Sequence, residues 1–276
     1  MILGERAMRR QAALVLFALF GACHVEKAPE TVNALARHFW RHFDDADAAM
    51  LNEAIDNLHA AVEGDALKPG AHKEGKIDAL LLEDIAGLPI EPTPEIKKAR
   101  GFFVLTHMKC TLEQAERVTY STKQAALHPG VYDSYERTFA SDFDTYRGRA
   151  EPTLIWNTHF RATILGASYT ADSHSDMRFV APSKATTERA FVVTRTFQPR
   201  PANFPGDAAL DQDYEIEVLY PTADGTTMHF FGIWRDIYIG AFSIQDEITL
   251  AVAVNELVKW DARSSETCQL GLVDSD

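Results

Sequence analysis

The chain has 276 residues, a formal net charge of −13 at pH 7 and an isoelectric point of about 5.2, and 46% of its residues are hydrophobic. An acidic chain without a stripe of basic residues argues against nucleic-acid binding, and it offers no electrostatic attraction to anionic lipids. The length and the ordinary hydrophobic content predict a globular protein of one large domain, or of one domain with a small extension.

The N-terminal segment consists of a basic part and an apolar part that ends at a cysteine. The apolar part covers the eleven residues 12–22, and Cys23 follows it. Eleven residues are too few for a helix that spans about 30 Å of hydrocarbon, which needs about 20. The segment is therefore predicted to be a secretion signal rather than a membrane span. Its basic part contains Arg6, Arg9 and Arg10.

The run from Leu19 to Cys23 resembles the lipobox of bacterial lipoproteins, because the small residues Gly21 and Ala22 directly precede the cysteine. The resemblance implies cleavage after residue 22 and a membrane anchor of acyl chains, such as palmitate, on Cys23. Each buried methylene of such a chain contributes about 0.8 kcal/mol. Phe20 stands where leucine is usual, so plain secretion and an uncleaved anchor remain alternatives.

The residue after the cysteine helps to predict whether the protein would be anchored in the inner or in the outer membrane. Lipoproteins that stay at the inner membrane often have Asp at this position, and the chain has His24. The resemblance therefore favours the periplasmic side of the outer membrane. Loss of residues 1–22 would remove three arginines and one glutamate, so the mature chain would be more acidic still.

Residues 23–30 are predicted to form a tether and residues 31–88 a helical module. Apolar residues recur at helical spacing over residues 32–43 and again over residues 50–62, and the acidic residues between them offer an N-cap, so a helical hairpin is expected. A Gly/Lys-rich loop over residues 68–76 and a short helix over residues 77–85 follow. Three prolines then predict a stiff connector over residues 89–98.

Residues 99–263 are predicted to form an α+β domain. It begins with a strand over residues 101–105, and Thr111 opens a helical stretch that ends at residues 128–130. The spacing of aromatic residues predicts a further helix over residues 131–146. Strands are then predicted over residues 153–160, 162–170, 176–182, 189–197, 213–220 and 226–242, the last of them either bent at Gly232 or divided into two strands.

The chain is predicted to close with a hairpin and a helix. Residues 222–225 have the sequence of a hairpin turn. A helix is expected from Asp246 to about Trp260, and residues 264–276 are expected to form a tail. This order of elements over residues 99–263 resembles the helix-grip architecture of START-like domains, although no sequence motif supports the resemblance.

The resemblance implies an α+β fold in which a helical hairpin module precedes a curved antiparallel sheet that wraps a C-terminal helix around an apolar cavity. A lipocalin-like barrel with a terminal helix is the alternative. Large apolar residues on both faces of residues 228–242 indicate either a covered core or a cavity wall. The loop over residues 198–213 is long enough to be a lid or an ordinary surface loop. Candidate cavity residues are Trp156, Phe160, Phe230 and Trp234.

Three histidines fall in predicted strands, namely His107, His159 and His229. If their side chains converged, they would form a zinc site or supply a general base. A histidine in a strand is more often a hydrogen-bonding partner or a surface residue, so no metal is expected. His38 and His42 share one helical face, as zinc ligands do, but the flanking arginines favour a polar helix face.

Two acidic patterns also have structural explanations. Residues 172–176 have the sequence Asp-Ser-His-Ser-Asp, for which a solvated hairpin turn is favoured over a metal site. Glu215 and Glu217 alternate with apolar neighbours, and this alternation predicts a strand face that is exposed to water.

Besides Cys23, the sequence contains two further cysteines. Cys110 and Cys268 form a disulfide in an oxidising compartment or remain two buried thiols, and both alternatives stay open.

The sequence has no nucleophile elbow, P-loop or dinucleotide motif, so no cofactor is expected and binding is favoured over catalysis. The leading hypothesis is that an apolar or amphipathic small ligand binds the concave face of the sheet. The alternatives are an interaction lipoprotein that presents its helical module to an envelope partner, and a hydrolase that uses the strand histidines.

Overall fold

The computed structural model describes residues 26–63, 71–164, 166–182, 189–240, 242–243 and 247–272, so the predicted signal and Cys23 lie outside the described residues. The helices are α1 (Val32–Arg41), α2 (Ala49–Glu63), α3 (Leu112–Tyr120), α4 (Gln124–Leu127), α5 (Phe143–Arg147) and α6 (Glu247–Gln269), with short 3₁₀ helices η1 (Leu82–Ile85) and η2 (Ile96–Lys98). The strands are β1 (His72–Lys76), β2 (Arg100–Met108), β3 (Tyr132–Phe139), β4 (Thr153–Ile164), β5 (Ala167–Val180), β6 (Phe191–Phe197), β7 (Ala208–Pro221), β8 (Thr227–Ile239) and β9 (Phe242–Ser243).

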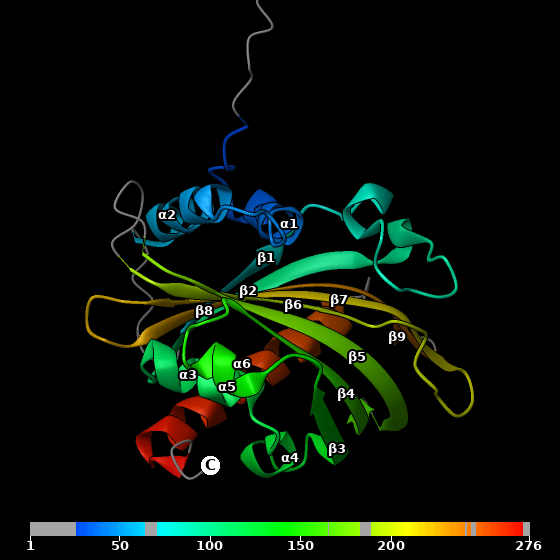
Figure 1. Cartoon of the computed structure of the whole chain (residues 1–276). Coiled ribbons are helices and arrows are strands. Elements are labelled where there is room, and N and C mark those ends of the chain that lie inside the picture. Colours follow the sequence, from blue (N-terminus) through cyan, green and yellow to red (C-terminus); the bar gives the residue numbers. More distant parts are fainter. Residues whose placement is uncertain are drawn as a thin grey trace, which may run out of the picture.

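In the described part of the chain the strands form one antiparallel sheet. Their order is β1-β2-β8-β7-β6-β5-β4-β3, and β9 pairs with β8. Because β1 and β3 are its two edges, the sheet is open and is not a closed barrel. Figure 1 shows α1 and α2 on one face of the curved sheet, and α3, α5 and α6 on the other. The predicted α+β fold with a curved sheet and a C-terminal helix is confirmed.

The face that α1 and α2 cover is a packed hydrophobic core. The Trp40 ring of α1 makes edge contacts with the rings of Tyr214 and Trp234, at centroid distances of 5.8 and 5.9 Å. Gly232 of β8 allows this close approach, because a Cβ atom there would lie 2.9 Å from Ile216 Cγ2 and 3.2 Å from the Cβ of Ala36. The apolar side of the helical hairpin is therefore buried against the sheet.

The segment before the proline-rich connector differs from the expected loop, because residues 72–76 form β1. This strand pairs with β2 over its whole length, and His72 lies opposite Thr106. Its side chains are mostly charged, which is typical of an edge strand because charges discourage pairing with a further chain. The predicted helical module thus also contributes a strand to the sheet.

The helix predicted over residues 131–146 is wrong for the first part of the segment, since Tyr132–Phe139 form β3 and only the end of the segment is helical, as α5. Tyr132 pairs with Ala162 and Tyr135 pairs with Phe160, so three steps along β3 match two steps along β4. The irregularity after Tyr132 places an extra residue in the strand, as a β-bulge does. Tyr132 and Tyr135 therefore share one face of a strand at the spacing that normally indicates a helix.

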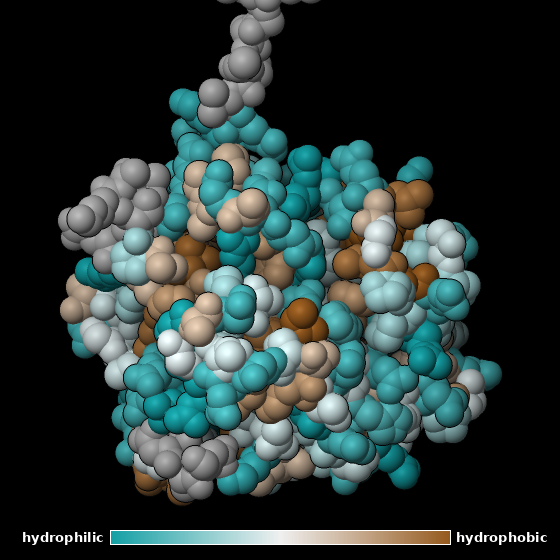
Figure 2. Space-filling view, in the orientation of Figure 1, coloured by the Kyte–Doolittle hydropathy of each residue, from teal (hydrophilic) through white to brown (hydrophobic). Residues whose placement is uncertain are grey.

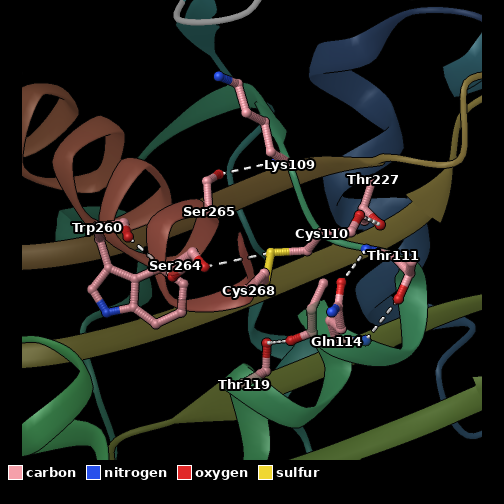
Figure 3. Close-up of a disulfide and its surroundings, with 11 residues drawn as sticks. Lys109, Cys110, Thr111, Gln114, Thr119, Thr227, Trp260, Ser264, Ser265 and Cys268 are labelled. Carbon is pink, nitrogen blue, oxygen red and sulfur yellow. Dashed lines mark hydrogen bonds between the residues drawn. A yellow bond between two sulfur atoms is a disulfide. The ribbon is translucent and has the colours of Figure 1, made fainter. Parts of the chain in front are cut away.

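The C-terminal helix is longer than predicted, and a disulfide holds its end. Helix α6 continues to Gln269, so residues 264–269 are helical and do not belong to a tail. Cys268 forms a disulfide with Cys110, which follows β2 (Figure 3). Beside it, the backbone N–H of Lys109 donates a hydrogen bond of 3.0 Å to the Ser265 hydroxyl. These contacts fix the end of α6 to the segment between β2 and α3.

The visible surface is largely hydrophilic, with hydrophobic side chains at scattered positions (Figure 2). Among the described residues, no helix has both the length and the apolar character that a membrane crossing requires. In the described part of the chain, the exposed large hydrophobic side chains are those of Leu81, Leu82, Tyr238, Leu270 and Leu272.

Candidate ligand-binding site

A cavity of about 360 Å³ lies between the concave face of the sheet and α6. Its wall is built from β3, β4, β5, β7 and β8, and from one side of α6 that includes Ala253, Leu257 and Trp260. The volume falls within the range of about 300–1,000 Å³ that is typical of small-molecule sites. Helix α6 covers the concave face of the sheet, and the cavity lies between the two.

Aromatic rings from three neighbouring strands line one part of the cavity. The Tyr132 ring lies 5.7 Å from the Phe160 ring, which in turn lies 5.8 Å from the Tyr169 ring. Burial raises the pKa of Tyr169 to about 12, so its phenol is neutral at neutral pH. This part of the wall is therefore uncharged, and it suits a flat or apolar group.

The loop between β6 and β7 packs against the rim of the aromatic part. Asn203 pairs with Thr170 of β5 through two backbone hydrogen bonds of 2.8 and 3.1 Å. The Phe204 ring stacks on Tyr169 at a centroid distance of 4.7 Å. The loop that the sequence left open as a lid or a surface loop thus contacts a residue of the cavity wall.

The sheet side of the cavity carries an ion-pair network. Arg235 donates to both carboxylate oxygens of Asp213, with Nε–Oδ1 and Nη2–Oδ2 distances of 2.9 and 2.6 Å, and to Glu215 Oε1 at 3.0 Å. Burial raises the pKa of Glu215 well above its usual range, and the neighbouring Asp213 charge raises it further while Arg235 opposes the shift. Glu215 therefore binds a proton more readily than an exposed glutamate does.

A buried histidine links the sheet to α6. His229 Nδ1 lies 2.8 Å from Oδ1 of Asp261 on α6, and its Nε2 lies 3.4 Å from Glu217 Oε2. Thr106 donates a hydrogen bond to the other oxygen of Asp261. Burial alone would lower the pKa of His229, but the charge and hydrogen bond of Asp261, together with Glu217, raise it to about 10. His229 is therefore an imidazolium at neutral pH and cannot act as a general base there.

Two buried donors in the cavity wall lack partners. Arg137 donates through Nη1 to the carbonyl oxygen of Thr119 at 2.6 Å, and its guanidinium lies 4.5 Å from the Trp156 ring centroid. Within the described part of the chain, Arg137 Nε and Trp156 Nε1 have no hydrogen-bond acceptor. Burial lowers the pKa of Arg137, but guanidinium groups stay protonated in proteins. Both N–H groups are suited to an acceptor oxygen of a ligand.

The structure divides the four predicted cavity residues into two groups. Trp156 and Phe160 line the cavity. Phe230 and Trp234 do not, because they point to the opposite face and are buried under α1 and α2. That part of the prediction is wrong, because β8 has large apolar residues on both faces and their alternation does not reveal which face is hollow.

The prediction that Glu215 and Glu217 face water is also wrong. The alternation along β7 exists, but the apolar side faces α1 and α2 while the acidic side faces the cavity. The segment over residues 172–176 is likewise not a turn, since it lies within β5, where Ser173 and Ser175 line the cavity.

The three strand histidines do not converge. His229 lines the cavity, whereas His159 is exposed and pairs with Asp172 at 2.7 Å from Nδ1 to Oδ1. His107 contacts the hydroxyl of Thr226 at the end of the neighbouring strand. These three residues therefore form neither a zinc site nor a shared catalytic cluster.

Several residues of the site were not recognised in the sequence. Arg137 was hidden because the bulge in β3 gave its segment a helical period. Asp213 was assigned to the end of a loop, and Arg235 was one charge within a largely apolar strand. The available signal was the charge itself, since Arg235 directly follows a continuous run of buried residues in β8.

No protein-family model and no curated protein matches the sequence. Solved structures that are similar to the chain include human StAR-related lipid transfer protein 5, with 9% identity, a TM-score of 0.42, and coverage of 81% of this chain and 97% of that one. A STAR-related lipid transfer protein from Xanthomonas axonopodis has 11% identity and a TM-score of 0.38, over 73% of this chain and 93% of that one. A START superfamily protein from Mycobacterium smegmatis has 9% identity and a TM-score of 0.39, over 62% and 97%. Because these identities are 9–11% and the TM-scores are 0.38–0.42, we infer the function from the cavity and not from these structures.

Proposed function

We propose that the protein binds one small amphipathic molecule in the cavity between the sheet and α6. The observation that carries the proposal is the division of the cavity wall into an uncharged aromatic part and a part with buried, hydrogen-bonding charges. An apolar ligand would leave the polar groups without partners, and a highly polar ligand would not use the rings. An amphipathic molecule satisfies both parts.

The wall also indicates how such a molecule would be oriented. Its apolar body would lie against Tyr132, Phe160 and Leu257, which line the same cavity. Its acceptor oxygens would receive hydrogen bonds from Arg137 Nε and Trp156 Nε1, two buried donors of the cavity wall that have no partner among the described residues. A hydroxyl, carbonyl or carboxylate group has the required chemistry.

Titration with anilinonaphthalene sulfonate tests this proposal, because the dye combines an aromatic body with acceptor oxygens and fluoresces in apolar surroundings. We expect one site per chain. Arg137→Met should weaken binding about 10- to 100-fold, since it removes a charged donor, and Trp156→Phe about 2- to 10-fold, since it removes only a neutral one. Arg161→Met is the matched control, because Arg161 is exposed on the outer side of β4.

The control and the unaltered chain should bind the dye equally well. Equal binding by the Arg137→Met and unaltered chains would contradict the proposed site. Binding of several dye molecules with low affinity would also contradict it, since that result describes a surface and not a cavity.

We further propose that the chain is attached to the envelope through acyl chains on Cys23. The resemblance of residues 19–23 to a lipobox supports this, and a disulfide is compatible with an oxidising compartment. Cys23→Ser should move the protein from the membrane fraction to the soluble periplasmic fraction. A Cys23→Ser chain that remains in the membrane fraction would contradict the anchor and leave the cavity proposal untouched.

A further inference from the structure

A pair of histidines on α1 is buried on the side of the sheet opposite the cavity. His38 and His42 lie one helical turn apart, with ring centroids 4.2 Å from each other, and are only 5% and 9% exposed. The sequence favoured a polar helix face here, and the burial shows that this interpretation is wrong. In the part of the chain that the structure describes, the Nε2 atoms of both rings are buried and without a hydrogen-bond partner.

The second nitrogen of His42 is held by a carboxylate. Oδ2 of Asp45 lies 2.7 Å from His42 Nδ1, so the proton of a neutral ring is placed on Nδ1 and the lone pair on Nε2. Histidines that bind a metal through one ring nitrogen usually donate a hydrogen bond from the other nitrogen to a carboxylate of this kind. His38 Nε2 is likewise buried and has no hydrogen-bond partner among the described residues, so this ring also has a nitrogen to offer to an ion.

Glu26, from the segment before α1, brings a third ligand atom to the pair. Its Oε1 lies 3.5 Å from His42 Nε2, and one ligand atom from each of Glu26, His38 and His42 lies within 4.8 Å of the others. Two ligands about 2.1 Å from a tetrahedral ion are about 3.4 Å apart. Glu26 and His42 therefore already have the spacing of two ligands, and because the three ligand atoms all lie within 4.8 Å of one another, a shift of about 1.4 Å or less places His38 at that spacing too.

The neighbouring charges do not oppose a cation. Arg41 Nη1 lies 3.7 Å from Glu26 Oε1, but Arg41 also contacts Asp84 through Nε at 3.5 Å. Arg37 pairs with the same Asp84 carboxylate at 2.6 Å. The carboxylates of Glu26, Asp45 and Asp84 thus outnumber the guanidinium groups of Arg37 and Arg41.

We propose that Glu26, His38 and His42 bind a zinc ion. Two imidazoles and one carboxylate form a ligand set that zinc uses with a fourth position open to water. Imidazole ligands also favour a transition metal over Ca²⁺ or Mg²⁺. The ion would fix the segment before α1 to the helix, and it would lie on the other face of the sheet from the cavity.

Zinc titration against a competing chelator tests the site directly. The chain is purified without a polyhistidine tag and stripped of metal, and we expect it to bind one Zn²⁺. The double variant His38→Gln with His42→Gln should lose the site. Asp45→Asn, which removes only the carboxylate beside His42 Nδ1, should bind about 10- to 100-fold more weakly. His72→Gln, at a half-exposed histidine beside Glu74 on β1, is the matched control.

Two further measurements keep the test decisive. Glu26→Gln changes an exposed residue outside every helix, so it should weaken binding even if the double variant fails to fold by circular dichroism. Co²⁺ in place of Zn²⁺ should give the intense visible absorption of a four-coordinate ion in the unaltered chain but not in the double variant. A chain that binds no Zn²⁺, or that binds it equally well after substitution of both histidines, would overturn the proposal.

Discussion

The two faces of the sheet are built from the same strands but in opposite ways. The face under α1 and α2 is closed, with rings such as Trp40 and Trp234 in edge contact. The face under α6 leaves a cavity of about 360 Å³ with a network of buried charges. The difference shows that one strand can supply both a dry core and a polar binding wall, according to what covers each face.

Strand β7 shows this most clearly. Tyr214, Ile216 and Val218 point into the packed core, and Glu215 and Glu217 between them point into the cavity. An alternating strand normally has one face in the core and one in water. Here α6 covers the acidic face, and neighbouring charges such as Arg235 compensate the buried carboxylates.

Neighbouring phenylalanines on β8 offer the strongest test of the difference between the faces. Phe230 is fully buried in the packed core beside Phe103, so Phe230→Ala should lower the free energy of unfolding by about 3–5 kcal/mol. Phe231→Ala should cost less, since one side of this ring already faces the cavity. Denaturant unfolding of both variants measures the difference.

Phe230→Ala and Phe231→Ala also distinguish an effect on stability from an effect on ligand binding. Only Phe231→Ala should weaken binding of anilinonaphthalene sulfonate in the folded state. If both variants lost the same free energy and bound the dye equally, the proposed difference between the two faces would be incorrect.

The disulfide is expected to stabilise the cavity face in particular. Cys110 and Cys268 are separated by 158 residues and join the end of α6 to the segment after β2. Replacement of both cysteines by serine should lower the free energy of unfolding by about 2–5 kcal/mol. Hydrogen exchange should accelerate in α6 more than in α1, and equal acceleration in the two helices would show that the disulfide has no special role at the cavity.

A smaller effect is expected from pH, through His229 on the cavity face. Its pKa is raised from 6.5 to about 10 in the folded state, chiefly by Asp261 against the effect of burial. The folded state therefore holds a proton that the unfolded state loses, so this stabilisation is complete below pH 6.5 and disappears as the pH rises toward about 10. His229→Gln should flatten the decline in unfolding free energy over this interval, and an unchanged decline would assign it to other groups.

The order of the helices and strands could largely be predicted from the sequence, because most of these elements are specified by patterns of neighbouring residues. Helical spacing predicted α1 and α2, and Thr111 marks the start of α3, where its hydroxyl accepts a hydrogen bond from the Gln114 backbone. The hairpin turn at residues 222–225 also follows from local preferences. The bulge in β3 misled the prediction, because pairing with β4 decides that conformation and local spacing does not.

The cavity was harder to predict, because the pattern of residues along a strand does not indicate which of its two faces α6 covers. Phe160 and Phe230 are similar residues in similar strands, yet one lines the cavity and the other is in the core. The network around Arg235 joins β7 and β8, and His229 joins the sheet to α6. Such contacts are set by tertiary packing, so sequence spacing alone does not reveal them.

Native mass spectrometry of the protein, released gently from the cells that make it, tests the central claim most directly. We predict one bound small molecule per chain, and its loss in Ser173→Trp, which places a large ring in the cavity. Arg161→Trp places the same ring on the outer side of β4 and should keep the bound molecule. A chain that carries no bound molecule, or a Ser173→Trp chain that is folded and retains it, would contradict the account.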